Sequence, residues 1–83
     1  MENLEKYQKA FKEALELKDE EIANLTDLEY LGIASWDSVG HMGLVAAIED
    51  EFDIMMDTDD IIDFSSYKKG IELLKKYDVL IEE

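Results

Sequence analysis

The stretch LGIASWDSVGHMGLVAAIEDEF, residues 31–52, carries the clearest structural signal in this chain. From residue 38 onward its apolar side chains recur at three- and four-residue steps, the spacing of one face of an α-helix. This stripe consists of Leu44, Val45, Ile48 and Phe52. Asp37 or Ser38 is a suitable N-cap, because a short side chain can accept a hydrogen bond from a backbone N–H of the first turn. The pattern predicts a helix over 38–52 whose stripe faces the core.

The segments on either side of this stretch predict a small helical bundle. Helical spacing of apolar residues indicates a first helix over 3–18, a short helix over 58–64 and a last helix from 67 to about 81. Residues 19–36 read as a long loop held by apolar anchors, namely Leu25, Leu28, Leu31, Ile33 and Trp36. No segment alternates apolar and polar residues for long, so strands are not expected. We predict one all-α domain over 1–83, with three longer helices, one short helix and a long first loop.

Composition and charge restrict the class of protein. The chain has 83 residues, with 22 acidic and 8 basic side chains and a formal net charge of -14. Residues 19–67 contain no Lys or Arg and carry the whole negative charge, so they repel nucleic acid and anionic membranes and attract basic partners. There is no Cys, and no apolar run is long enough to span a bilayer. The first residues contain no apolar signal segment, so we expect a cytoplasmic protein and, most simply, a monomer.

A second apolar stripe lies on the helix predicted over 38–52. Val39, Met42 and Ala46 also follow three- and four-residue steps, but Ala46 is about 200° around the helix from Leu44. This second stripe therefore points away from the core. We interpret it as a contact surface for a partner. The alternative is that it packs against the loop over 19–36.

A hydrolase is considered and rejected. Asp37, Ser38 and His41 are the residue types of a catalytic triad, and Ser38 and His41 could meet on one helix. Acyl transfer would also need a cleft, an oxyanion hole and a strained nucleophile turn, and the string WDSVG lacks the first Gly of that turn motif. We expect no catalysis by this chain, and we expect His41 to be an exposed helix residue.

A calcium site is also rejected. Five Asp residues lie close together in the sequence: Asp53, Asp57, Asp59, Asp60 and Asp63. A calcium-binding EF-hand loop needs acids at alternate positions, a central Gly and a final Glu. This stretch contains no Gly and has two Met where early ligands would stand. We expect no specific metal site.

The residues around Ser38 resemble the attachment region of acyl carrier proteins. The string LGIASWDSV, residues 31–39, is similar to the segment in which the Ser of an Asp-Ser-Leu motif carries 4′-phosphopantetheine. The following LVAAIEDEFD, residues 44–53, looks like the second helix of that family. The resemblance extends over essentially the whole chain and implies an acyl-carrier-like bundle. It implies that a phosphopantetheinyl transferase loads Ser38, beside Asp37, from coenzyme A.

The resemblance also implies a function and a docking surface. Acyl or aminoacyl groups would travel as thioesters on the arm to loading enzymes and acyltransferases with basic surfaces, in fatty acid biosynthesis or in a specialised pathway. The positions matching the family's partner-facing residues are Val39, Met42, Ala46, Glu49, Asp50, Glu51 and Asp53.

The chain departs from the family pattern at several positions directly after the Ser. Val39 replaces the usual Leu, and Gly40, His41 and Gly43 are uncharged where housekeeping members usually carry acids. These departures favour a dedicated pathway over general fatty acid synthesis. The alternative function is an unmodified acidic adaptor or inhibitor that docks on a basic enzyme through the same helix.

Overall fold

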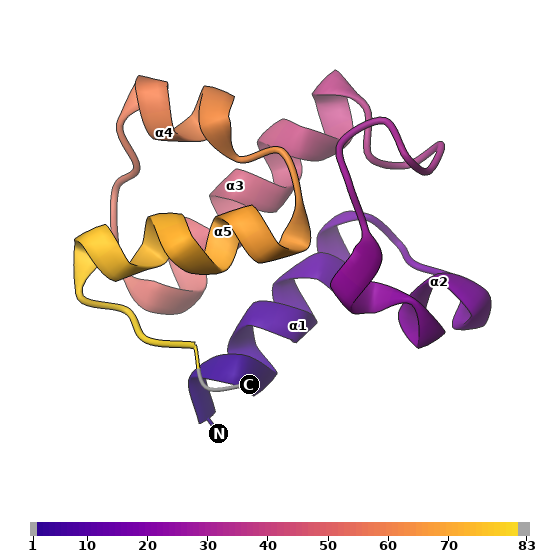
Figure 1. Cartoon of the computed structure of the whole chain (residues 1–83), viewed down its shortest axis with the longest axis horizontal. Coiled ribbons are helices and arrows are strands. Elements are labelled where there is room, and N and C mark those ends of the chain that lie inside the picture. Colours follow the sequence, from indigo (N-terminus) through magenta and orange to yellow (C-terminus); the bar gives the residue numbers. More distant parts are fainter. Residues whose placement is uncertain (1, 82–83) are drawn as a thin grey trace.

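The computed structural model describes residues 2–81, and within them the all-α prediction is confirmed (Figure 1). The elements in chain order are α1 (Glu2–Ala14), α2 (Asp19–Ala23), the 3-10 helix η1 (Leu25–Asp27), α3 (Ser38–Phe52), α4 (Thr58–Asp63), α5 (Tyr67–Leu74) and the 3-10 helix η2 (Lys75–Tyr77). Residues 2–81 contain no β-strand, although an isolated antiparallel bridge joins Glu29 to Ser66. Met1, Glu82 and Glu83 of the predicted domain lie outside the described residues.

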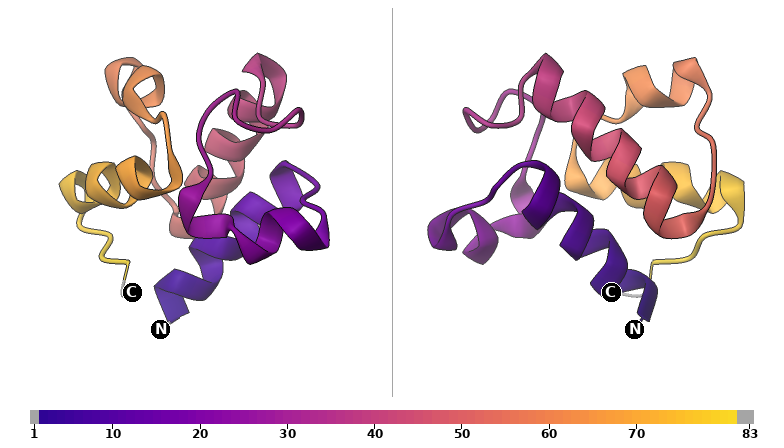
Figure 2. Two further views of the ribbon diagram at one scale, coloured as in Figure 1. Left: turned by 45° about the vertical axis from the view of Figure 1, so that its right-hand side comes forward. Right: turned by 180° about the vertical axis from the view of Figure 1, so that it is seen from behind.

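Helix α3 packs along α1, and the two run in roughly opposite directions (Figures 1 and 2). Helix α5 packs against η1 and continues into η2. Helix α4 and the start of α3 lie on the same side of the molecule, away from the N-terminal end of α1 (Figure 1). The last described residues return to α1, where the Asn3 side-chain amide donates to the Leu80 carbonyl oxygen at 3.0 Å. This arrangement leaves the start of α3 and α4 free to form a surface of their own.

An aromatic cluster forms the centre of the core. Phe11 from α1 contacts Trp36 from the long loop, with ring centroids 5.3 Å apart, and Tyr67 from α5, with centroids 5.1 Å apart. Tyr7 and Phe64 complete the cluster, and all five side chains are almost fully buried. Burial of such large rings is the main source of stability in a domain this small. The cluster therefore ties the long loop to α1, to α5 and to the residue that follows α4.

The apolar stripe predicted for α3 faces this core, and the bounds of α3 are those expected. Leu44, Val45 and Ile48 are buried, and Phe52 packs at the edge of the core. The side chain of Asp37 caps the helix. The stripe and the cap agree, which is why this element was predictable.

The first and last helices are shorter than expected. Helix α1 ends at Ala14 rather than at residue 18, because Glu16 adopts the left-handed conformation with φ 48°. The Leu17 N–H then donates to the Lys12 carbonyl, which closes the helix end as in a Schellman motif although no Gly is present. At the other end, α5 gives way to η2, and Asp78 is left-handed with φ 62°. Both ends stop where the chain must turn back across the core.

The region 19–36 is a loop only in part. It contains the short helix α2 and η1, which were not expected. Leu25, Leu28 and Trp36 are buried as predicted, and Ile33 packs at the edge of the core. The prediction for Leu31 was wrong, because this side chain is 67% exposed and its backbone is left-handed with φ 67°. A non-Gly residue with positive φ costs free energy, so the surrounding loop holds Leu31 in that conformation.

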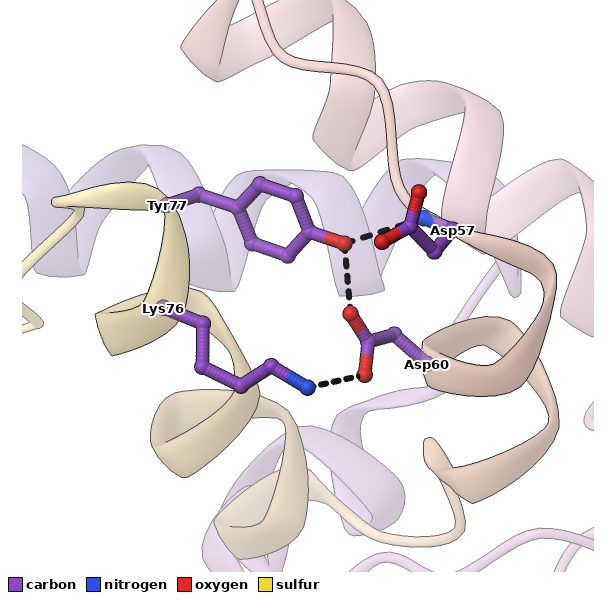
Figure 3. A network of polar contacts seen from close by, with 4 residues as sticks. All are labelled: Asp57, Asp60, Lys76 and Tyr77. Carbon is purple, nitrogen blue, oxygen red and sulfur yellow. Dashed lines mark hydrogen bonds and ion pairs between the residues drawn. The ribbon is translucent and has the colours of Figure 1, made fainter.

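A buried carboxylate joins α4 to η2 (Figure 3). Asp60 is only 3% exposed and accepts hydrogen bonds from the Lys76 ammonium and from the Tyr77 hydroxyl, each at 2.5 Å. The Tyr77 oxygen in turn accepts from the Asp57 backbone N–H at 2.9 Å. The hydrogen bonds from Lys76 and Tyr77 lower the pKa of the Asp60 carboxyl below its ordinary value. Asp60, one of the five Asp residues considered for a calcium site, thus forms a structural ion pair with Lys76.

We predict that Asp60→Asn lowers the free energy of unfolding at neutral pH. The free energy of unfolding of this variant should also fall less steeply than that of wild type as the pH is lowered. Because the pKa of Asp60 is lower in the folded than in the unfolded chain, its stabilisation is present above about pH 4 and is lost as the pH falls through the folded pKa. Urea denaturation between pH 2.5 and 7 measures this. Asp63→Asn is the matched control, because Asp63 is an exposed residue of the same helix. Parallel pH profiles for wild type and Asp60→Asn would contradict the prediction.

Candidate functional site

Ser38 is the first residue of α3 and lies exposed at its N-terminal end. The Asp37 side chain, through Oδ1, accepts a hydrogen bond from the Gly40 N–H at 2.9 Å and so caps the helix. The capping role therefore does not consume the Ser38 hydroxyl, which has no hydrogen-bond partner among residues 2–81. The sequence prediction of a cap at Asp37 or Ser38 resolves to Asp37, and Ser38 is left available.

The loop before Ser38 is held at both ends. Trp36 is fully buried, and its carbonyl accepts from the Leu31 N–H at 2.8 Å, which closes the loop on itself. Upstream, the Tyr30 N–H donates to the Ser65 carbonyl and the Tyr67 N–H donates to the Leu28 carbonyl, each at 2.9 Å. These two bonds attach the loop to the start of α5. The position of Ser38 is therefore set by tertiary contacts and not by α3 alone.

Gly40 allows the loop to lie directly on the first turn of α3. A Cβ at this position would come within 1.9 Å of the Ser35 carbonyl oxygen, which is backbone and cannot move aside cheaply. A Gly in a helix costs stability relative to Ala, but here its missing side chain makes the close approach possible. Gly43 differs, because a Cβ there would meet nothing within 4 Å.

His41 is not the exposed helix residue that the sequence predicted. The ring is half-buried, and both of its nitrogens are bonded. The Trp36 Nε1–H donates to His41 Nδ1 at 3.0 Å, which makes Nδ1 the acceptor, and Nε2 then donates to the Ile61 carbonyl oxygen at 2.8 Å. The neutral ring thus links the loop, α3 and α4. It also has no nitrogen free to accept a proton from Ser38, which argues against a Ser–His hydrolase.

A cavity of about 340 Å³ lies beside Ser38, between the start of α3 and α4. Its walls are Ser38, His41 and Met42 from α3, Ile61 and Ile62 from α4, and Phe64 just beyond α4. Tyr30 and Ser65 complete the lining. The lining runs from exposed side chains such as Ile62 to the buried Phe64, so the cavity extends from the surface to the edge of the aromatic core. It is a mainly apolar space beside a free hydroxyl.

The second apolar stripe of α3 is exposed, as expected. Val39 is 80% exposed and Met42 is 57% exposed, and Ala46 is exposed as well. These side chains do not pack against the loop over 19–36, which was the alternative. The stripe therefore forms an apolar surface next to Ser38.

The four acids predicted on the lower part of α3 divide into two pairs. Glu49 accepts a hydrogen bond from the Met56 backbone N–H at 2.8 Å, and Glu51 forms an ion pair with Lys9 at 3.5 Å. Asp50 and Asp53 are exposed. Among these four acids, only Asp50 and Asp53 have side-chain carboxylates without a hydrogen bond or ion pair to another of the described residues.

Residues 2–81 contain no group of three or more His, Asp or Glu side chains placed to hold a metal ion. In the same part of the chain, no helix is long and apolar enough to cross a membrane.

Comparison with protein-family models places residues 8–74 in the family described as the phosphopantetheine attachment site. The match begins within α1 and ends with α5, so it includes the long loop, Ser38 and the whole of α3. No curated protein and no solved structure matches the chain significantly.

We predict opposite effects for the two helix glycines beside Ser38. Gly40→Ala should lower the free energy of unfolding by about 1 to 3 kcal/mol, because the new methyl group must displace the Ser35 backbone. Gly43→Ala should raise it by up to about 1 kcal/mol, because Ala favours the helix and meets open space. Chemical denaturation of both variants measures the difference. Equal effects would show that the loop does not press on the first turn.

Proposed function

Because this chain belongs to the phosphopantetheine attachment site family, whose members bear that group covalently, we propose that it is an acyl carrier protein modified at Ser38. The family assignment establishes a carrier with a phosphopantetheine arm. The observation that supports Ser38 as the attachment residue is its hydroxyl, which is exposed at the start of α3 and free because Asp37 makes the cap.

The surroundings of Ser38 suit the group. A phosphodiester is an anion, and the N-terminal end of the 15-residue helix α3 presents backbone N–H groups and the positive end of the helix dipole. A mainly apolar cavity lies directly beside the Ser38 hydroxyl. The chain has no Cys, so its own residues supply no thiol. When bound, the arm supplies the thiol that holds an acyl group as an activated thioester.

Ser38 is modified by a separate phosphopantetheinyl transferase in this proposal. The Ser38 Oγ forms a bond to the coenzyme A phosphorus nearest the pantetheine, and the bond from that phosphorus to adenosine 3′,5′-bisphosphate breaks. The hydroxyl proton passes to the transferase, because the only His of the chain has both ring nitrogens engaged. The chain itself therefore presents the hydroxyl and the docking surface, and partner enzymes carry out the chemistry.

The docking surface in this proposal combines the exposed apolar stripe with the free acids of α3. Val39, Met42 and Ala46 give an apolar contact next to Ser38. Asp50 and Asp53 continue the surface toward the C-terminal end of the helix and attract Lys and Arg of partner enzymes. Glu49 and Glu51 add to the negative field but already have intramolecular partners. A flexible arm then raises the effective concentration of the cargo at a docked enzyme.

The first turn of α3 also supports a dedicated pathway. The four residues after Val39, Gly-His-Met-Gly, carry no formal charge with His neutral. In the structure His41 is committed to internal hydrogen bonds, so this turn offers partners an apolar surface and no ionic contact. Partners that recognise acids directly after the modified Ser would bind this carrier less well. We therefore place it in a specialised pathway and not in general fatty acid synthesis.

Incubation with coenzyme A and a broad-specificity phosphopantetheinyl transferase should add one phosphopantetheine to the wild-type chain. Ser38→Ala should remain unmodified, and Ser35→Ala, a matched control on the loop, should be modified like wild type. Intact mass spectrometry measures the addition. A folded wild-type chain that several transferases leave unmodified would refute the carrier proposal and favour the unmodified acidic adaptor.

Charge reversal on α3 should slow docking. We predict that Asp50→Lys lowers the kcat/KM of the transferase several-fold at low salt, and that the difference shrinks as the ionic strength rises. Glu72→Lys is the matched control, because it makes the same change of charge at an exposed position on α5. Equal values of kcat/KM for the two variants at every salt concentration would contradict a docking role for Asp50.

A further inference from the structure

One side chain that lines the cavity beside Ser38 is also hydrogen-bonded to the core. His41 contributes to the cavity wall, and its Nδ1 edge meets the N–H edge of the fully buried Trp36, so that its ring is nearly coplanar with the indole, with centroids 6.3 Å apart. Phe64 contacts the same ring edge-on at 5.9 Å. The imidazole therefore lies between the cavity and Trp36, and we call this part of the cavity wall its floor.

This floor is fixed in place. The Trp36 indole N–H holds Nδ1, and the Ile61 carbonyl oxygen holds Nε2. Rotating the ring away would break both hydrogen bonds and leave the Trp36 N–H, which belongs to a fully buried side chain, without a partner. Trp36 and Leu44 are almost completely buried, and neither of them lines the cavity. While His41 stays where it is, the imidazole separates the cavity from Trp36.

The chemistry of the lining restricts what the cavity accepts. Apart from His41, its polar side chains are the hydroxyls of Tyr30, Ser38 and Ser65, and the lining includes no Asp, Glu, Lys or Arg. An ammonium or carboxylate on the cargo would lose its hydration there without gaining a charged partner. A volume of about 340 Å³ is near the lower end of the range for small-molecule sites. The space suits a short, uncharged, apolar group.

We infer that His41 sets the depth of this cavity, so that the carrier shelters a short apolar acyl group and leaves longer chains outside the bundle. The inference rests on the proposed function, since it takes Ser38 as the attachment point. It makes His41 a specificity-determining residue, because the rigid ring decides how much of the cargo is buried. Polar aminoacyl cargo would stay in solvent.

The test loads Ser38 directly from acetyl, butyryl, octanoyl and dodecanoyl coenzyme A, with mass spectrometry to confirm each product. In wild type, the Tm should rise from the acetyl to the butyryl form and gain little more from the longer chains. In His41→Ala, the Tm should keep rising with the octanoyl form, because the missing ring opens a path toward Trp36. His41→Phe keeps the ring volume without the hydrogen bonds and should retain the short limit.

Wild type alone keeps the inference falsifiable if the variants do not fold. A Tm that climbs steadily through the dodecanoyl form of wild type would overturn it. The same comparison is made on the unmodified chain by NMR, with the butyryl and octanoyl thioesters of N-acetylcysteamine as free probes. Butyryl should shift the signals of Met42 and Ile61 and octanoyl should leave Leu44 unmoved, whereas octanoyl shifts at Leu44 would overturn the inference. This NMR experiment does not need Ser38 to be modified. It therefore tests the cavity inference even if the carrier proposal fails.

Discussion

Burial of the Trp36 indole is the interaction on which the rest of this structure depends. The ring is fully enclosed, packs edge-on against Phe11 of α1 and Phe64 beyond α4, and satisfies its one N–H on His41. A buried indole without a partner for that N–H would be costly, so the loop and α3 must stay in register with each other. Ser38 lies two residues after this anchor. Its placement is thus a consequence of core packing, although the residue itself is exposed.

The absence of two side chains is as important as the presence of the indole. At Gly40 a Cβ would strike the loop backbone, and at Gly70 it would come within 2.2 Å of the Tyr7 hydroxyl and 2.4 Å of the Phe64 ring. Both glycines lie in helices, where they lower local stability. They are tolerated because each permits a close approach that joins separate elements: the loop to α3, and α1 to α5. The fold gives up some helix stability in return for its tertiary contacts.

Much of α3 and its surfaces could be predicted, and much of the loop could not. The helix over 38–52 followed from the apolar period and the Asp37 cap, and the exposure of Val39 and Met42 followed from the same period. The end of α1 carried no sequence signal, because the left-handed residue there is a Glu and not a Gly. Helix α2 is too short to show a period.

The role of His41 was missed because the ring accepts from the Trp36 side chain and donates to Ile61, twenty residues further on. Such a contact exists only in the folded chain. The exposed position of Ser38 at the helix start was predictable from the local pattern, whereas the internal use of Glu49 and Glu51 required the positions of Met56 and Lys9. Periodicity can separate a core face from a solvent face, but it does not show which exposed acids already have a partner.

The same buried indole has a spectroscopic consequence. Trp36 is the only tryptophan of the chain, so all of its indole emission arises two residues from Ser38. The emission wavelength of a tryptophan depends on the polarity around it, and this ring is fully buried among aromatic side chains with an imidazole as its hydrogen-bond acceptor. A partner that lifts the loop from the core would shift the emission to the red. The protein therefore carries an intrinsic, label-free optical probe of the loop that precedes Ser38.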